Sequence, residues 1–170
     1  MGMIPDILNY QLNNLIGKCF EINRMLDRGM SLLMVRWKMP NASKILHESV
    51  AHIYPSDVFA DSISDYQGLR DAESIYPATP AGDRDYNSPV DFFRDFVAEN
   101  REFEDMIKDG IELAERESDY TTKNFLNGLL NRLVPYTALS LQLVDMFEAC
   151  ENDKFKLMML DAEMEDIIGE

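Results

Sequence analysis

The sequence predicts an all-α fold, a bundle of four helices with one long crossover and a short C-terminal helix. Three observations predict it. Apolar residues recur at steps of three or four through most of the chain, which is the period of amphipathic helices. No stretch shows the sustained alternation of apolar and polar residues that strands require. A single proline-rich segment divides the helical stretches into two pairs.

The first helix is expected between Ile4 and Trp37. Pro5 suits its first turn, and Pro40 should end it, because the residue before a proline is pushed out of the helical region. The apolar positions that define its buried face are Leu8, Leu12, Leu15, Cys19, Ile22, Leu26, Met30, Leu33 and Trp37.

The second helix is expected to begin with Ser43 or Asn41 as its cap and to run to about Ser74. Pro55 lies inside this stretch, where it removes a backbone hydrogen bond and crowds the preceding turn. The helix is therefore either kinked there or divided into two pieces. The sequence leaves both alternatives open.

The segment 75–89, IYPATPAGDRDYNSP, is too rich in proline, glycine, Asp and Asn for a regular helix or a central strand. Its length suits a crossover that travels along a bundle before the chain reverses direction. A third helix should then open with Ser88 as cap and Pro89 at its first position. A fourth should follow a tight turn at Ser118 and Asp119, with Pro135 bending it. Residues 1–150 are thus expected to form the bundle, and residues 151–170 an acidic C-terminal helix or tail.

The composition of the chain limits the classes of partner that the protein can bind. The chain has 170 residues, with 31 acidic against 16 basic side chains and a net charge of −15. This length fits one domain, and the charge excludes a generic nucleic-acid binder. No apolar run approaches the length of a membrane span, and the first residues do not read as a secretory signal. Cys19 and Cys150 form no Cys-x-x-Cys pair, so two reduced thiols in a cytoplasmic protein are expected.

Five side chains in the second helical stretch could carry chemistry, namely His47, Glu48, His52, Asp61 and Asp65. In a continuous helix Glu48 and His52 share one face, as do Asp61 and Asp65, since each pair is four residues apart. Imidazole together with carboxylates suits iron, manganese or zinc, and an oxygen-rich set favours iron or manganese. The alternative, a solvated acidic face with two incidental histidines, remains open. The chain has neither a nucleophile elbow nor a glycine-rich phosphate loop, which argues against a hydrolase or a nucleotide-binding protein.

The sequence resembles the ferritin-like superfamily and, within it, the Dps-type miniferritins, which oxidise and store iron in twelve-subunit shells. The resemblance begins with Trp37, a short turn containing proline and asparagine, and the run Leu46-His47-Glu48. It continues in Asp61 and Asp65, which are spaced as the family's paired carboxylates are. The start of the fourth helix, from Asp119 onward, is also similar.

The resemblance implies iron as the metal, a homo-oligomer, and ferroxidase activity with peroxide or dioxygen as oxidant. It assigns His47 as an iron ligand of one subunit and Asp61 and Asp65 as ligands from another, across a two-fold interface. The site departs from the family pattern. Arg36 stands where the family has a histidine, and Ala51, with His52 beside it, stands where an acidic ligand is usual. These departures favour the alternative of a ferritin-like bundle without a working metal centre, acting as a structural or protein-interaction protein.

Overall fold

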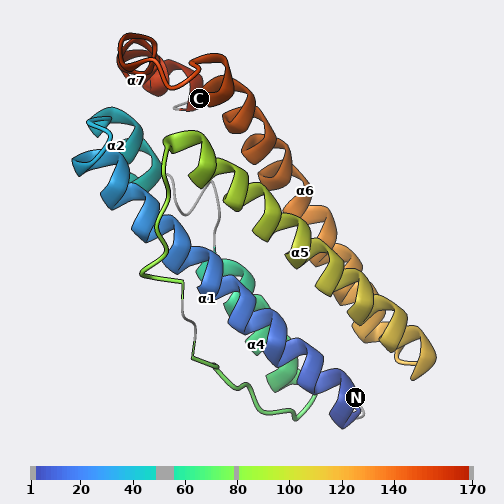
Figure 1. The fold of residues 1–170 in the computed structure, drawn as a ribbon. Coiled ribbons are helices and arrows are strands. Elements are labelled where there is room, and N and C mark those ends of the chain that lie inside the picture. Colours follow the sequence, from blue (N-terminus) through green and yellow to red (C-terminus); the bar gives the residue numbers. More distant parts are fainter. Residues whose placement is uncertain (1–2, 49–55, 79–80, 169–170) are drawn as a thin grey trace.

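The computed structural model describes residues 3–48, 56–78 and 81–168 of the chain (Figure 1). This part is all-α and contains no strand, which confirms the predicted fold class. None of its helices is both long and apolar enough to cross a membrane. The helices are α1 (Asp6–Val35), α2 (Pro40–Glu48), α4 (Ser56–Leu69), α5 (Pro89–Arg116), α6 (Tyr120–Ala149) and α7 (Lys154–Ile168).

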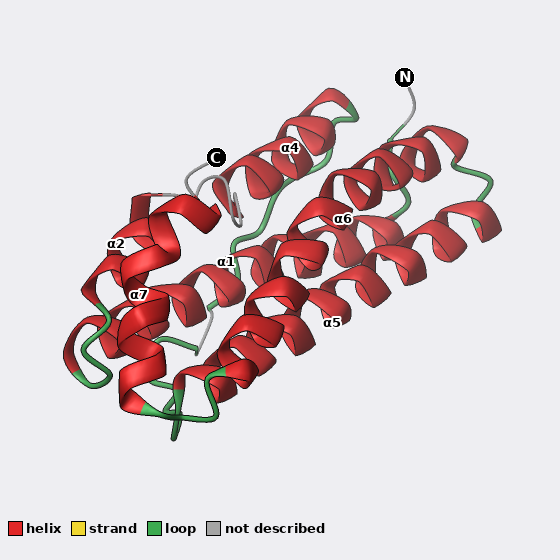
Figure 2. Ribbon diagram, turned by 90° about the horizontal axis from the view of Figure 1, so that it is seen from above, coloured by secondary structure: helices red, strands yellow, loops and turns green. Residues whose placement is uncertain are grey.

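The three long helices α1, α5 and α6 run along the length of the bundle, and α2 and α4 pack along α1 (Figures 1 and 2). The crossover between α4 and α5 follows the outside of the bundle from one end toward the other (Figure 1). The predicted order of helix pair, crossover and helix pair is therefore confirmed. Helix α7 lies at the end of the bundle that also holds α2.

Helix α1 follows the predicted apolar period closely. Its buried side chains include every predicted position from Leu8 to Leu33, whereas Trp37 lies just beyond the helix and packs partly buried against the core. Cys19 and Cys150 are both buried free thiols, as expected.

The predicted start of the second helix was wrong. Helix α2 begins at Pro40 itself, before either expected cap. Proline fits the first helical position because its missing N–H would have no partner there and its φ is already helical. The Ser43 hydroxyl does not cap; it donates to the Met30 carbonyl, 2.7 Å away. Residues His52 and Pro55 lie outside the described residues, so the question of a kink or a break is not answered.

The crossover is longer than predicted, because α4 ends at Leu69 rather than near Ser74. The predicted cap of the third helix is confirmed, and the predicted turn at Ser118 and Asp119 supplies the cap of the fourth. The Ser88 hydroxyl accepts from the Asp91 N–H at 3.3 Å, with Pro89 in the first turn of α5. The Asp119 carboxylate accepts from the Thr122 N–H at the start of α6.

The closest approach of α1 to α5 depends on Gly29. A Cβ atom added there would lie 2.0 Å from Cε2 of Phe92, so any larger residue would have to push the ring out of the core. Phe92 packs edge-on against Phe93, and Phe93 against Phe147 of α6, with ring centroids 4.8 and 4.4 Å apart. This aromatic group joins α1 to the α5–α6 pair.

Helix α7 is fastened to α2 by a side-chain cap. The buried Asp161 carboxylate accepts from the backbone N–H groups of Asn41 and Ala42, at 3.3 and 2.7 Å. These N–H groups lie in the first turn of α2 and have no partner within their own helix. The C-terminal helix therefore completes the start of α2.

We expect Asp161→Ala to lower the free energy of unfolding by about 1 kcal/mol, the usual cost of losing a helix cap. Urea denaturation at neutral pH measures it. The control is Glu163→Ala, which removes an exposed carboxylate from the same helix and should change little. Equal losses in the two variants would contradict a capping role.

Candidate functional site

The structure places three of the five predicted ligands on the surface. His47 lies at the end of α2 with an exposed side chain, and Asp61 and Asp65 are exposed on α4, one helical turn apart. The side chain of Glu48 and the whole of His52 lie outside the described residues.

Within one chain, these residues do not assemble a metal site. No group of three or more His, Cys, Asp and Glu side chains in the described part of the chain is arranged to hold a metal ion. Asp61 and Asp65 form a pair of carboxylates without an imidazole, and His47 stands on a different helix. A complete coordination shell would need further ligands from outside this set.

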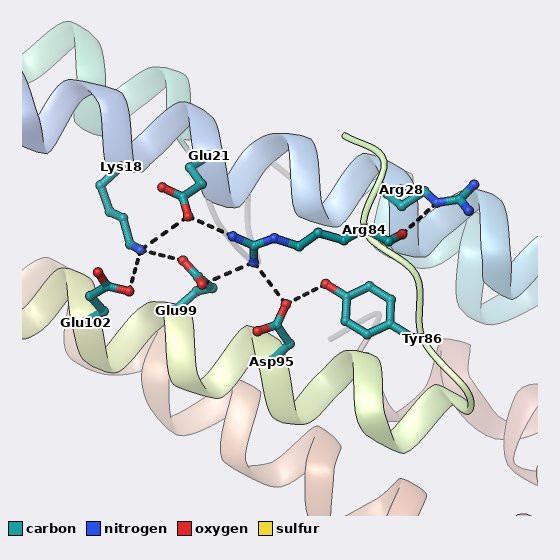
Figure 3. A network of polar contacts seen from close by, with 8 residues as sticks. All are labelled: Lys18, Glu21, Arg28, Arg84, Tyr86, Asp95, Glu99 and Glu102. Carbon is teal, nitrogen blue, oxygen red and sulfur yellow. Dashed lines mark hydrogen bonds and ion pairs between the residues drawn. The ribbon is translucent and has the colours of Figure 1, made fainter. Parts of the chain in front are cut away.

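The largest cluster of charged side chains lies between α1, α5 and the crossover (Figure 3). Lys18 of α1, only 4% exposed, ion-pairs with Glu99 and also contacts Glu102 at 2.8 Å and Glu21 at 3.6 Å. These residues, with the crossover residues below, form what we call the α1–α5 network.

The crossover contributes Arg84 to this network. Its guanidinium contacts Glu21 at 2.8 Å, Asp95 at 3.0 Å and Glu99 at 3.1 Å, so it joins α1 to α5 (Figure 3). Tyr86 donates to the same Asp95 carboxylate. Arg84 thus contacts both helices with one side chain, and Tyr86 adds a second bond from the crossover to α5.

Contacts within the α1–α5 network change the pKa values of its members. Burial lowers the pKa of the Lys18 ammonium, but hydrogen bonds to Glu102 and Glu99 outweigh burial and leave that pKa raised. Burial and the hydrogen bond to Asp95 together raise the pKa of Tyr86. Lys18 and Arg84 stay charged at neutral pH, and they occupy carboxylates that could otherwise bind a cation. Glu21 of α1 is one of these occupied carboxylates.

One polar side chain inside the bundle has no partner. Asn100 of α5 is fully buried, and neither its amide nitrogen nor its oxygen makes a hydrogen bond in the described part of the chain. An unpaired buried amide costs about 1–3 kcal/mol. Its helical neighbours one turn away include the buried phenyl rings of Phe96 and Phe103.

Comparison with known proteins identifies the family. A family model described as "Ferritin: Ferritin-like domain" matches residues 22–138, more than half of the chain. The chain belongs to the ferritin-like domain family.

Solved structures show the same ferritin-like fold. Two structures of an open pore ferritin from the hyperthermophilic archaeon Archaeoglobus fulgidus superpose with TM-scores of 0.79 and 0.81, at 20% identity, over 95% of this chain and 97% of theirs. A humanized archaeal ferritin gives a TM-score of 0.78 at 20% identity, over 95% of each chain. A search of curated proteins gives no match.

A second cluster of buried polar side chains lies at the end of the bundle away from α2 and α7. Arg70, which follows α4, donates to both Asp119 oxygens at 3.1 and 3.2 Å, and to the Tyr66 hydroxyl at 2.7 Å. Tyr66 in turn is hydrogen-bonded to Thr122 at 2.7 Å. Asp119 therefore caps α6 and, through Arg70, also holds the start of the crossover.

Sequence reasoning missed Lys18, Arg84 and Arg70. Only Lys18 carried a signal, because it falls on the buried side of α1 beside Cys19, where a lysine needs partners. Arg84 and Arg70 lie in irregular chain, and no period indicates where such side chains point.

We expect Lys18→Met to lower the free energy of unfolding by about 3 kcal/mol at neutral pH. The variant removes the buried cation that Glu99 and Glu102 share and keeps the apolar stem, so Glu99 is left with Arg84 alone. Urea denaturation measures the loss. Lys123→Met is the control, since it breaks a more exposed pair with Glu115 and should cost less than about 1 kcal/mol. Similar losses in both variants would contradict a central role for Lys18.

Asp119 gives a pH-dependent prediction. Burial raises its pKa, but the hydrogen bonds from Arg70 and Thr122 outweigh burial, so the pKa lies below its ordinary value of 3.8. A carboxyl group with a lowered folded-state pKa stabilises the protein above its unfolded pKa, and this stabilisation is lost as pH falls through the folded value.

Asp119→Asn should therefore be destabilised by about 3 kcal/mol near pH 7, because Arg70 loses its ion pair with the Asp119 carboxylate. The difference in free energy of unfolding between this variant and the parent should narrow below about pH 3.8. Urea midpoints between pH 7 and pH 3 measure it, with the exposed Asp145→Asn as control. A gap that stays constant across this range would show that the ion pair is not its cause.

Proposed function

We propose that the protein binds, oxidises and sequesters iron as a Dps-like homo-oligomer, with each metal site shared between two subunits. His47 of one subunit and Asp61 and Asp65 of another are the proposed ligands. The observation that carries this proposal is their exposure on a ferritin-like bundle. None of the three takes part in an ion pair with another described residue, so each is available to a cation.

The surroundings of the two aspartates support a shared site. Val58 and Leu69 lie on α4 before and after them and are 46% and 71% exposed. With Asp61 and Asp65 they form an exposed stripe at helical spacing, apolar at both ends and acidic in the middle. Burying the apolar ends against a second subunit would bring a partner ligand to the carboxylates.

The proposed chemistry follows from the donor set. Imidazole and carboxylates bind iron(II), and the two carboxylates stabilise the higher charge of iron(III). Each iron(II) gives up one electron. Peroxide accepts two electrons and two protons and leaves as two waters. The net charge of −15 gathers cations around the assembly, which favours sequestration of the oxidised product.

A second candidate is a ferritin-like bundle without a metal centre that works through protein contacts. One observation favours it: the α1–α5 network holds Glu21, Asp95, Glu99 and Glu102 in ion pairs with Lys18 and Arg84. The carboxylates at this place in the bundle are thus neutralised by protein cations rather than left open to a metal.

Anaerobic iron(II) titration of the metal-free protein, followed by peroxide or air, distinguishes the two candidate functions. We expect saturable binding and rapid oxidation in the parent. The double variant Asp61→Asn/Asp65→Asn and the variant His47→Ala should oxidise iron at least about tenfold more slowly, the scale of losing a charged ligand. Asp105→Asn/Asp109→Asn is the matched control, since these aspartates are also exposed and four residues apart on a helix.

Particle size is recorded in the same samples by sedimentation. A large particle that retains iron is expected of the parent. A strictly monomeric protein at high concentration, iron binding no greater than that of albumin, or a control variant as impaired as the Asp61/Asp65 variant would each overturn the proposal.

A further inference from the structure

We propose that a cavity at the α2–α7 end of the bundle binds a small amphipathic anion, with an apolar body and a carboxylate or phosphate head. The cavity has a volume of about 590 Å³, within the range of small-molecule sites. It lies between the turn that follows α1, the start of α5 and the first turns of α7. No residue of the proposed iron site lines it.

The charge of the cavity is opposite to that of the molecule. Among the described residues, its lining includes Arg36, Lys38 and Lys154 and no carboxylate, in a chain with almost twice as many acidic as basic residues. Arg36 is bound to Asp85 and to the Tyr86 carbonyl, so its charge is largely balanced. Lys38 and Lys154 take part in none of the ion pairs between described residues.

Most of the remaining wall is apolar, and Asn87, Ser88 and Asn152 add polar groups to it. Trp37 and Met39 line it from the turn, and Leu157 and Met158 from α7. Met158 is 59% exposed, so its side chain is open to contact with a ligand. Methionine and tryptophan offer adaptable and broad apolar contact to a flexible chain or ring. An anion with an apolar body would cover this wall and place its head beside the two lysines.

The turn that carries Trp37 and Lys38 is fixed by the backbone. The Trp37 N–H donates to the Leu32 carbonyl at 3.0 Å, and the Met39 N–H to the Leu33 carbonyl at 2.7 Å. Lys38 between them has a φ of 54°, in the left-handed region. These bonds hold one wall of the cavity in place before any ligand arrives.

Trp37 is the only tryptophan of the chain, so its fluorescence reports on this cavity directly. We would titrate the metal-free protein with decanoate and with decyl phosphate below their micelle concentrations, and with decanol as the neutral analogue. Both anions should shift the Trp37 emission saturably, and decanol should bind at least about tenfold more weakly, as expected when a charge-assisted hydrogen bond is lost. Binding of decanoate alone or decyl phosphate alone would identify the preferred head group.

Two variants test the lysines. Lys38→Gly removes the ammonium and also relieves the left-handed backbone, so weaker binding cannot be attributed to a less stable fold. Lys154→Glu reverses the charge at the first position of α7, where an acid is favoured by the helix dipole. Each should weaken decanoate binding about tenfold or more.

Each test variant has a control in which the same kind of change is made at a position that does not line the cavity. Ser118→Gly relieves a left-handed residue (φ 55°) in the turn between α5 and α6, and Lys108→Glu reverses an exposed charge in the middle of α5. Neither should alter binding. The proposal is overturned if no saturable shift occurs, if decanol binds as tightly as decanoate, or if the controls weaken binding as much as the test variants. Because no iron is present, failure of the proposed iron function would not change this result.

Discussion

The contact between α1 and α5 is the interaction on which the rest of the bundle depends. Each helix pair, α1 with α4 and α5 with α6, buries only part of its apolar surface by itself. The two pairs meet where Gly29 admits the Phe92 ring, and where Lys18 and Arg84 bind the carboxylates of both helices. Arg84 also fixes the crossover, because its guanidinium lies between α1 and α5. The long connection is therefore part of the interface that it spans.

This arrangement has a chemical consequence. A lysine buried among glutamates stays charged, and the glutamates stay bound to it, so that region of the bundle is occupied by protein ion pairs. Asn100 adds an amide, and not a carboxylate, to the interior. The ligands of our iron proposal therefore lie on the surface, where Asp61 and Asp65 are exposed on α4. This is why our functional proposal depends on a second subunit.

The ends of the bundle are stabilised in the same physical way. At one end Arg70 and Asp119 join the start of the crossover to the cap of α6. At the other, Asp161 of α7 caps α2, and the first turns of α7 form one wall of the cavity beside Trp37. In each case a carboxylate satisfies helix N–H groups that have no intrahelical partner. The acidic composition thus has structural uses as well as an electrostatic one.

The amino-acid sequence by itself determined the long helices, their order and the cap of α5. The apolar period, Ser88 with Pro89, and Asp119 are local signals, and local signals can be recognised without knowledge of the neighbours. The start of α2 at Pro40 was missed because proline both ends and begins helices. The contacts of Lys18, Arg84 and Asp161 were decided only by the tertiary structure. Each of the three has a partner 63 to 120 residues away along the chain, and only the packing of the helices brings such partners within hydrogen-bonding distance.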